Sequence, residues 1–234
     1  MADYIDYVQN NMIPSCPITK EDIIQAEDIL GPNLVSLKGK TVRKSPERVV
    51  LNSLDNLPNE LLTEHGNVTI AIDIMYINGI PFMMTTSQAI HFGTAEMIKN
   101  EMKWTIIKSI QQIIDTYHGR GFKIKHILGD RQFKCIKSHM ELQGFNLNIT
   151  GRDEHVPEIE WFLHTVKERA RAIVNTLPFE TQPHRLIVQI VYNRMFWLNC
   201  FPHKNGIHPT MSPRTIVTGS NIDYDNHCKL QFGA

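Results

Sequence analysis

The pattern of apolar and polar residues predicts an α/β domain from about residue 67 onward. Runs of apolar, often β-branched residues predict five strands, and Asn78-Gly79 predicts a hairpin turn between the first two. These strands cover 68–77, 80–88, 90–98, 122–129 and 145–150. Apolar residues recur at helical spacing over 101–118, 134–143, 154–177 and 184–200. Three strands as a meander, followed by alternating helices and strands, indicate a mixed five-stranded sheet flanked by helices.

The first 66 residues carry too few apolar positions for a core of their own. We interpret residues 1–66 as a mostly irregular N-terminal extension or linker. Within it, Thr19 and Asp22 have the spacing of a capping box and predict a short helix that Gly31 ends. The core is expected at 67–228, and residues 229–234 are expected to be a truncated C-terminal tail.

Composition argues against a disordered, a membrane-spanning or a secreted protein. Hydrophobic residues make up 42% of the 234 positions, which is enough for a folded core. No apolar run approaches the roughly 18 residues that a membrane-spanning helix needs, and the acidic start does not resemble a secretory leader. Four scattered cysteines are typical of a reduced compartment, so we expect an intracellular protein.

The formal net charge of zero is a cancellation between segments. Residues 1–30 carry six acidic residues and one lysine, whereas residues 38–48 carry five basic residues and one acidic residue. Residues 99–137 carry nine basic and three acidic residues. Such basic blocks hold phosphates in some proteins and are ordinary solvated faces in others. Charge alone leaves both interpretations open.

Two aspartates stand at informative positions of the predicted strands. Asp73 interrupts an apolar strand, where a charge is costly unless it is paired, bound to a metal or turned to solvent. Asp130 follows the end of another strand, and ligand-binding sites in α/β sheets gather at the carboxyl ends of strands. An aspartate that caps a helix or forms a turn would explain this position equally well. Both positions are candidates for a carboxylate site.

The helix predicted at 154–177 adds a third carboxylate. Glu160 lies at the edge of its buried face, with His164, Lys167 and Arg171 on the same stripe, while Glu158 projects to the opposite edge. Asp73, Asp130 and Glu160 could converge as hard oxygen ligands for two Mg²⁺ ions, an arrangement that assists phosphoryl transfer. The alternative is an exposed glutamate above a solvated face.

Four segments between about Gly66 and Cys228 carry a resemblance to a known family. They are AIDIMYINGIPF, ILGDRQF, EIEWFLHTVKERARA and WLNCFPHKNGIHPTMSPRTIVTG. The chain resembles the integrase catalytic core of copia-type LTR retrotransposons, within the retroviral integrase and ribonuclease H-like superfamily. The family's glutamate helix is matched in register, which selects Glu160 over Glu154 and Glu158. The matching residues are Glu160, Thr165, Glu168, Arg169, Ala170 and Arg171.

This resemblance implies a fold and an activity. It implies a ribonuclease H-like fold and a polynucleotidyl transferase that processes DNA 3′ ends and joins them to a target. Asp73, Asp130 and Glu160 would be both the catalytic residues and the ligands of two Mg²⁺ or Mn²⁺ ions about 4 Å apart. The partners would be the element's DNA ends, a target duplex and further copies of the chain, without a membrane, in the nucleus.

Contacts to DNA are likewise implied by the resemblance. Lys167, Arg171 and His164 would touch the backbone of the element's DNA end, where phosphate contacts position the substrate without specifying its sequence.

The chain also departs from the family pattern. Arg131 and Gln132 follow the second aspartate, where the family usually has asparagine and glycine, and only 29 residues separate Asp130 from Glu160. Two further hypotheses therefore stand beside an active integrase. One is an inactive or repurposed fragment that only binds nucleic acid or another chain. The other is a ribonuclease H-like nuclease with four acidic residues, for which Glu101 is the candidate fourth acid.

Overall fold

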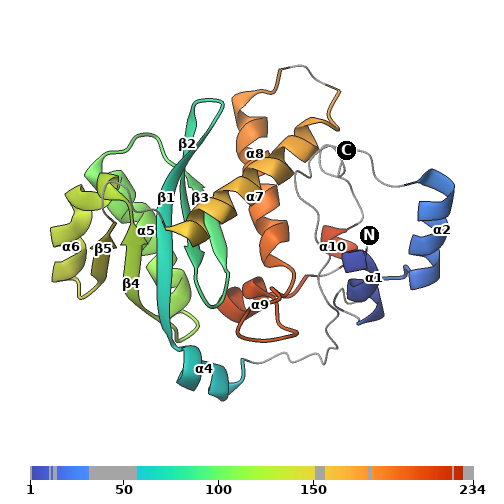
Figure 1. The fold of residues 1–234 in the computed structure, drawn as a ribbon, viewed down its shortest axis with the longest axis horizontal. Helices are drawn as coiled ribbons and strands as arrows, with labels where there is room; N and C mark the ends of the chain where they lie inside the picture. The colour runs from blue at the N-terminus through green and yellow to red at the C-terminus, as the bar shows by residue number, and fades with distance from the viewer. Residues whose placement is uncertain are drawn as a thin grey trace.

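The structure is a computed structural model that describes residues 2–10, 12, 15–31, 57–150, 156–178, 181–222 and 224–228. Figure 1 shows the strands side by side with helices on both sides of them. The strands are β1 (Asn67–Ile77), β2 (Ile80–Ser87), β3 (Gly93–Met97), β4 (Lys123–Gly129) and β5 (Asn146–Ile149). The helices of the core are α5 (Lys103–His118), η1 (Arg131–Ile136), α6 (Lys137–Leu142), α7 (Pro157–Val174), α8 (His184–Asn199), α9 (Pro213–Thr218) and α10 (Tyr224–His227).

The five strands form one mixed sheet in the order β3-β2-β1-β4-β5. The hairpin partners β1 and β2 are antiparallel, as are β2 and β3, whereas β1 with β4 and β4 with β5 are parallel. Asn78 and Gly79 have φ angles of 48° and 77°, the left-handed values that a tight hairpin turn requires. The predicted fold class, a mixed five-stranded sheet flanked by helices, is confirmed.

Alternation along β1 divides the core into two layers. Ile70, Ile72 and Ile74 pack into the layer formed with α5, α6 and α9, whereas Ala71 and Met75 pack into the layer formed with α7 and α8. In Figure 1, α7 crosses in front of β1 while α5 lies behind the sheet. Asp73 shares the parity of Ala71 and Met75, so it belongs to the face that α7 covers.

Two helix boundaries differ from those predicted. The helix expected at 154–177 is α7, which begins at Pro157 because proline is suited to the first helical position. The helix expected at 134–143 is divided, since Asp130 caps a 3₁₀ helix, η1, that precedes α6. Glu154 lies outside the residues that the structure describes.

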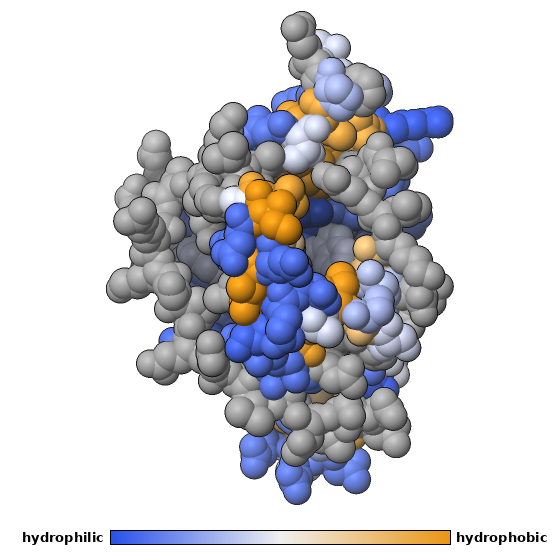
Figure 2. All heavy atoms as spheres, turned by 90° about the vertical axis from the view of Figure 1, so that its right-hand side faces the viewer, coloured by the Kyte–Doolittle hydropathy of each residue, from blue (hydrophilic) through white to orange (hydrophobic). Residues whose placement is uncertain are grey.

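The N-terminal extension contains more helix than expected. The predicted helix is present as α2 (Lys20–Leu30), where Thr19 and Asp22 form the capping box. The helices α1 (Ala2–Gln9) and α4 (Asn59–His65) were not predicted. No residue of α2 is buried, and its apolar side chains remain on the surface seen in Figure 2. Residues 38–48, the predicted basic block, and the tail at 229–234 lie outside the described ranges.

None of the helices in the described ranges combines the length and the apolar character that a membrane crossing requires.

The edge strand β3 is fixed to α8 by one buried side chain. The backbone N–H of Gly93 donates to Asn199 Oδ1 at 2.9 Å, and Asn199 Nδ2 donates to the Gly93 carbonyl at 2.7 Å. A Cβ atom at Gly93 would overlap the ring of Phe162 on α7, so glycine allows α7 and α8 to approach. Because an edge strand leaves backbone groups unpaired, Asn199 replaces the missing neighbouring strand.

We expect Asn199→Ala to lower the free energy of unfolding by about 2 to 4 kcal/mol, because it leaves a buried donor and a buried acceptor of Gly93 without partners. Urea unfolding followed by circular dichroism measures this change. The matched control is Asn148→Ala on β5, whose side chain is exposed and should change stability by less than about 0.5 kcal/mol. Equal losses for the two variants would contradict the bridging role of Asn199.

Candidate active site

Asp73 lies in the middle of β1, on the sheet face that α7 covers. Its side chain is partly buried, and it sits opposite Met84 of β2. Asp73 Oδ1 accepts hydrogen bonds from the backbone N–H of Ile74 at 2.7 Å and from Gln132 Nε2 at 3.2 Å. The carboxylate is therefore held by donors although its neighbours on the strand are apolar.

Asp130 stands beside Asp73 because of the register of the sheet. Ala71 of β1 pairs with Leu128 of β4, and extending this parallel register by two residues brings Asp130 level with Asp73. Neighbouring strands are separated by about 4.8 Å. Asp130 is exposed and caps η1, and its Oδ1 accepts a hydrogen bond from the backbone N–H of Gln132 at 3.1 Å. Asp130 therefore caps η1 and also lies beside Asp73.

Glu160 reaches the same region from the first turn of α7. It is exposed, whereas Ile159 beside it is buried against the sheet. In Figure 1 this first turn lies next to β1. Glu158 points elsewhere, since its Oε1 accepts a hydrogen bond from Gln88 Nε2 at 3.3 Å, just beyond the end of β2. The two glutamates thus belong to different edges of α7, as the helical spacing predicts.

The pKa of Asp73 depends on its burial and on the charged groups near it. Burial raises the pKa of Asp73 above its ordinary value, and the hydrogen bond from the Ile74 N–H opposes this change. The negative charges of Asp130 and Glu160 raise the pKa further, while the positive charge of Lys167 lowers it. The charges of Asp130, Glu160 and Lys167 therefore act on the carboxyl of Asp73.

The carboxylates form an open cluster. Within the described ranges, no three histidine, cysteine or acidic side chains lie close enough together to hold one ion. The donor chemistry nevertheless fits a divalent ion, because three carboxylates offer only hard oxygen ligands and a divalent cation would remove their mutual repulsion. The carboxylates have to approach one another for such an ion to bind.

The basic residues of α7 fall into two groups. Lys167 and Arg171 line a cavity of about 440 Å³ whose other walls include Tyr76 and Asn78 of the β1–β2 hairpin. Among the residues that the structure describes, no acidic side chain lines this cavity. His164 instead lies beside Glu168, with 3.7 Å between His164 Nδ1 and Glu168 Oε2. Lys167 and Arg171 thus line the same cavity, whereas His164 lies beside a negatively charged side chain.

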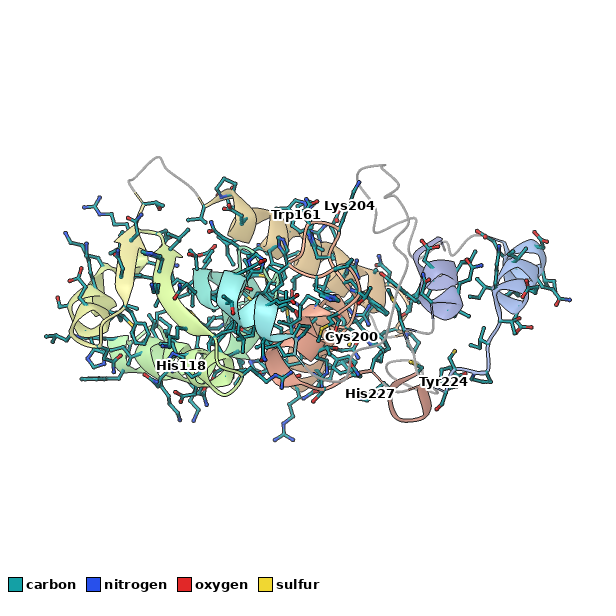
Figure 3. The ribbon with its side chains drawn as sticks, turned by 90° about the horizontal axis from the view of Figure 1, so that it is seen from below. His118, Trp161, Cys200, Lys204, Tyr224 and His227 are labelled. Atoms are coloured by element: carbon teal, nitrogen blue, oxygen red, sulfur yellow. The ribbon has the colours of Figure 1, made fainter. Side chains whose placement is uncertain are left out.

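An aromatic group beside this region was not identified from the sequence. The rings of His91 and His203 are stacked 3.8 Å apart, and Trp161 meets His203 edge-on at 6.3 Å. Burial, together with the charge of protonated His91, lowers the pKa of His203 to about 4, so this ring is neutral near pH 7. Figure 3 shows Trp161 on α7 and Lys204 on the loop after α8 along the same edge of the molecule.

Gln132 is the other residue of the site that sequence reasoning missed. It contacts both aspartates, but the sequence marks it only as a departure from the family pattern. A signal was present in its position two residues after Asp130, where a capping aspartate commonly accepts a hydrogen bond from the backbone. The contact of its side chain with Asp73 spans 59 positions and has no sequence pattern.

Comparisons with known proteins found similar solved structures. No family model and no curated protein matches the sequence. The crystal structure of the catalytic core domain of BIV integrase is similar, with 16% sequence identity and a TM-score of 0.47 over 64% of this chain and 92% of that chain. The HTLV-2 integrase catalytic core domain, in complex with magnesium and in a trimeric form, is similar at 13% identity and a TM-score of 0.48. That match covers 64% of this chain and 95% of the other.

We expect Asp73→Asn to stabilise the protein in metal-free buffer at pH 7. The raised pKa of Asp73 means that folding disfavours its ionised form, so the wild-type protein bears a penalty above this raised pKa. Below the ordinary aspartate pKa of about 3.9 the carboxyl is protonated in both states, and the advantage of the variant should vanish. Urea unfolding of both proteins with EDTA, at pH 7 and below pH 4, measures the difference.

The control for this prediction is Asp115→Asn on α5, an exposed aspartate far from Asp73 along the chain and on the other face of the sheet. Its stability should change by less than about 0.5 kcal/mol at either pH. A lower stability of Asp73→Asn than of the wild-type protein at pH 7 would contradict the assignment of an unfavourable charge to Asp73.

Proposed function

We propose that this chain is the catalytic core of a copia-type retrotransposon integrase. Its activity would be DNA 3′-end processing and strand transfer by an Asp-Asp-Glu triad. The observation that carries the proposal is that the charges of Asp130, directly after β4, and of Glu160, on α7, both act on Asp73 of β1. The similarity of the four sequence segments to that family adds to it.

The triad residues would hold two Mg²⁺ or Mn²⁺ ions through carboxylate oxygens. Such ions would supply activation of a water molecule or a DNA 3′-hydroxyl and stabilisation of the leaving oxygen. The protein's own part is to place Asp73 and Asp130 at the same level of two parallel strands, and to bring Glu160 to them from α7. The sheet thereby provides a rigid base for two of the three ligands.

Lys167 and Arg171 are proposed to hold the backbone of the DNA end. Lys167 acts electrostatically on Asp73, and both basic residues line the cavity beside the β1–β2 hairpin. A DNA strand that places a phosphate at the carboxylates would therefore continue along α7 past two positive charges. His164 is the third proposed contact, although its ring lies beside the carboxylate of Glu168.

The second candidate is an inactive or repurposed fragment that only binds nucleic acid. The open arrangement of the carboxylates in the described part of the chain favours it, because catalysis requires the triad to close around ions. A four-acid nuclease has less support. Its candidate fourth residue, Glu101, precedes α5 and is not among the charges that act on Asp73.

The proposed activity also implies where the protein acts and how many copies take part. An integrase acts on DNA ends and on a target duplex, so the site of action would be the nucleus. We propose that the chain acts as a homo-oligomer, because two DNA ends have to be joined to one target.

Glu160→Gln is expected to lower metal-dependent strand transfer by more than about 100-fold without loss of folding. We expect this magnitude because mutation of residues that only support metal ligands already lowers metal affinity or activity by about 10- to 100-fold. A duplex that represents the element's end is incubated with a target duplex and Mg²⁺ or Mn²⁺, and the joined product is quantified on a gel.

Glu158→Gln is the matched control, since its carboxylate contacts Gln88 at the other edge of α7. It should retain most of the activity. Loss of activity in Glu158→Gln with retention in Glu160→Gln would overturn the assignment of the triad. Cleavage without joining by the wild-type protein would indicate a nuclease, and DNA binding without either reaction would indicate the inactive fragment.

Lys167→Ala and Arg171→Ala are expected to weaken binding of the DNA end uniformly across sequences. Each lost phosphate contact should reduce the slope of log affinity against log salt by about 0.9. Fluorescence anisotropy at several salt concentrations measures the slope. Lys108→Ala on α5, which is exposed on the other face of the sheet, is the control and should leave the slope unchanged.

A further inference from the structure

Gln132 contacts both aspartates of the candidate site. Its backbone N–H donates to Asp130 Oδ1 at 3.1 Å, and its side-chain Nε2 donates to Asp73 Oδ1 at 3.2 Å. Asp73 belongs to β1 and Asp130 directly follows β4, so Gln132 is a hydrogen-bonded link between them.

The bonds leave one oxygen of each aspartate available. Asp73 Oδ1 accepts from Ile74 N–H and Gln132 Nε2, and Asp130 Oδ1 accepts from Gln132 N–H. No hydrogen bond to the Oδ2 atom of either aspartate is formed among the described residues. Each carboxylate is therefore oriented through one oxygen, while its other oxygen can bind a ligand.

The position of Gln132 is set by close packing below it. Gly129 ends β4 without a side chain, and a Cβ atom there would come within 2.9 Å of the Phe133 ring and 3.0 Å of Ile72. Phe133 and Ile136 are fully buried and fix η1 against the sheet. Because η1 is anchored on this side, the backbone of Gln132 is held where its side-chain amide reaches Asp73.

We propose that Gln132 is a positioning residue for metal binding at this site, and this inference rests on the proposed function. Its amide restrains the Asp73 carboxylate and its backbone restrains Asp130, so that their free oxygens are presented together. An amide donor also places partial positive charge between carboxylates that repel one another. Groups that orient metal ligands in this way are typically worth 10- to 100-fold in metal affinity.

The test is the affinity of the purified chain for Mn²⁺ and Mg²⁺, measured by isothermal titration calorimetry without DNA. Gln132→Met keeps the length of the side chain but removes the amide, and we expect it to raise the Kd for metal by about 10- to 100-fold. Gln132→Asn keeps the amide on a side chain too short to reach Asp73, and we expect it to behave like Gln132→Met. The backbone bond to Asp130 remains in both variants.

Gln111→Met is the matched control. Gln111 Nε2 donates to Asp115 Oδ1 at 2.8 Å on α5, so this variant removes the same type of bond away from the site. It should leave the metal Kd unchanged. The melting temperatures of all variants in EDTA should lie within about 2 °C of the wild-type value, which separates positioning from a loss of stability.

Equal or tighter metal binding by Gln132→Met would overturn this inference while leaving the proposed function intact. An absence of metal binding by the wild-type chain would overturn both. A further measurement does not depend on metal. In EDTA, the side-chain amide NMR signal of Gln132 should shift on Asp73→Asn, and an unchanged signal would overturn the contact on which the inference rests.

Discussion

The repulsion between carboxylates held at one end of a parallel strand pair is the constraint on which this site depends. Asp73 occupies a strand face where Ala71 and Met75 are buried, and the register of β1 with β4 places Asp130 at the same level. Such an arrangement is unfavourable by itself, because burial of Asp73, together with the charges of Asp130 and Glu160, raises the pKa of its carboxyl. It is maintained because the sheet is anchored on both faces by packing that does not involve these side chains.

The helix α7 combines a structural and a chemical role. Its buried residues complete the layer above β1 and β2, while the edge of the same face brings Glu160 and Lys167 toward Asp73. The close approach of α7 and α8 to the edge strand depends on Gly93 and on the bonds of Asn199. Changes in the packing of α7 should therefore alter the site even when they are distant from it.

The sheet and most helices of the core could be predicted because hydrophobic periodicity and turn chemistry are local. The hairpin at Asn78-Gly79, the capping box at Thr19 and the two edges of α7 follow from spacing alone. The 3₁₀ helix at Arg131–Ile136 was not predicted, because its formation depends on packing of Phe133 below Gly129. None of the apolar residues of α2 is buried among the described residues, since helical periodicity does not reveal whether a partner surface exists.

Sequence alone was sufficient for the order of the strands and main helices of the core, for the buried face of α7, and for the positions at which Asp73, Asp130 and Glu160 interrupt or border apolar segments. Only the tertiary structure decided that these charges act on one another, that His164 lies beside Glu168 and that Gln132 joins the two aspartates. The reason is physical. Periodicity depends on residues a few positions apart, whereas these contacts depend on strand register and on side-chain directions across the fold.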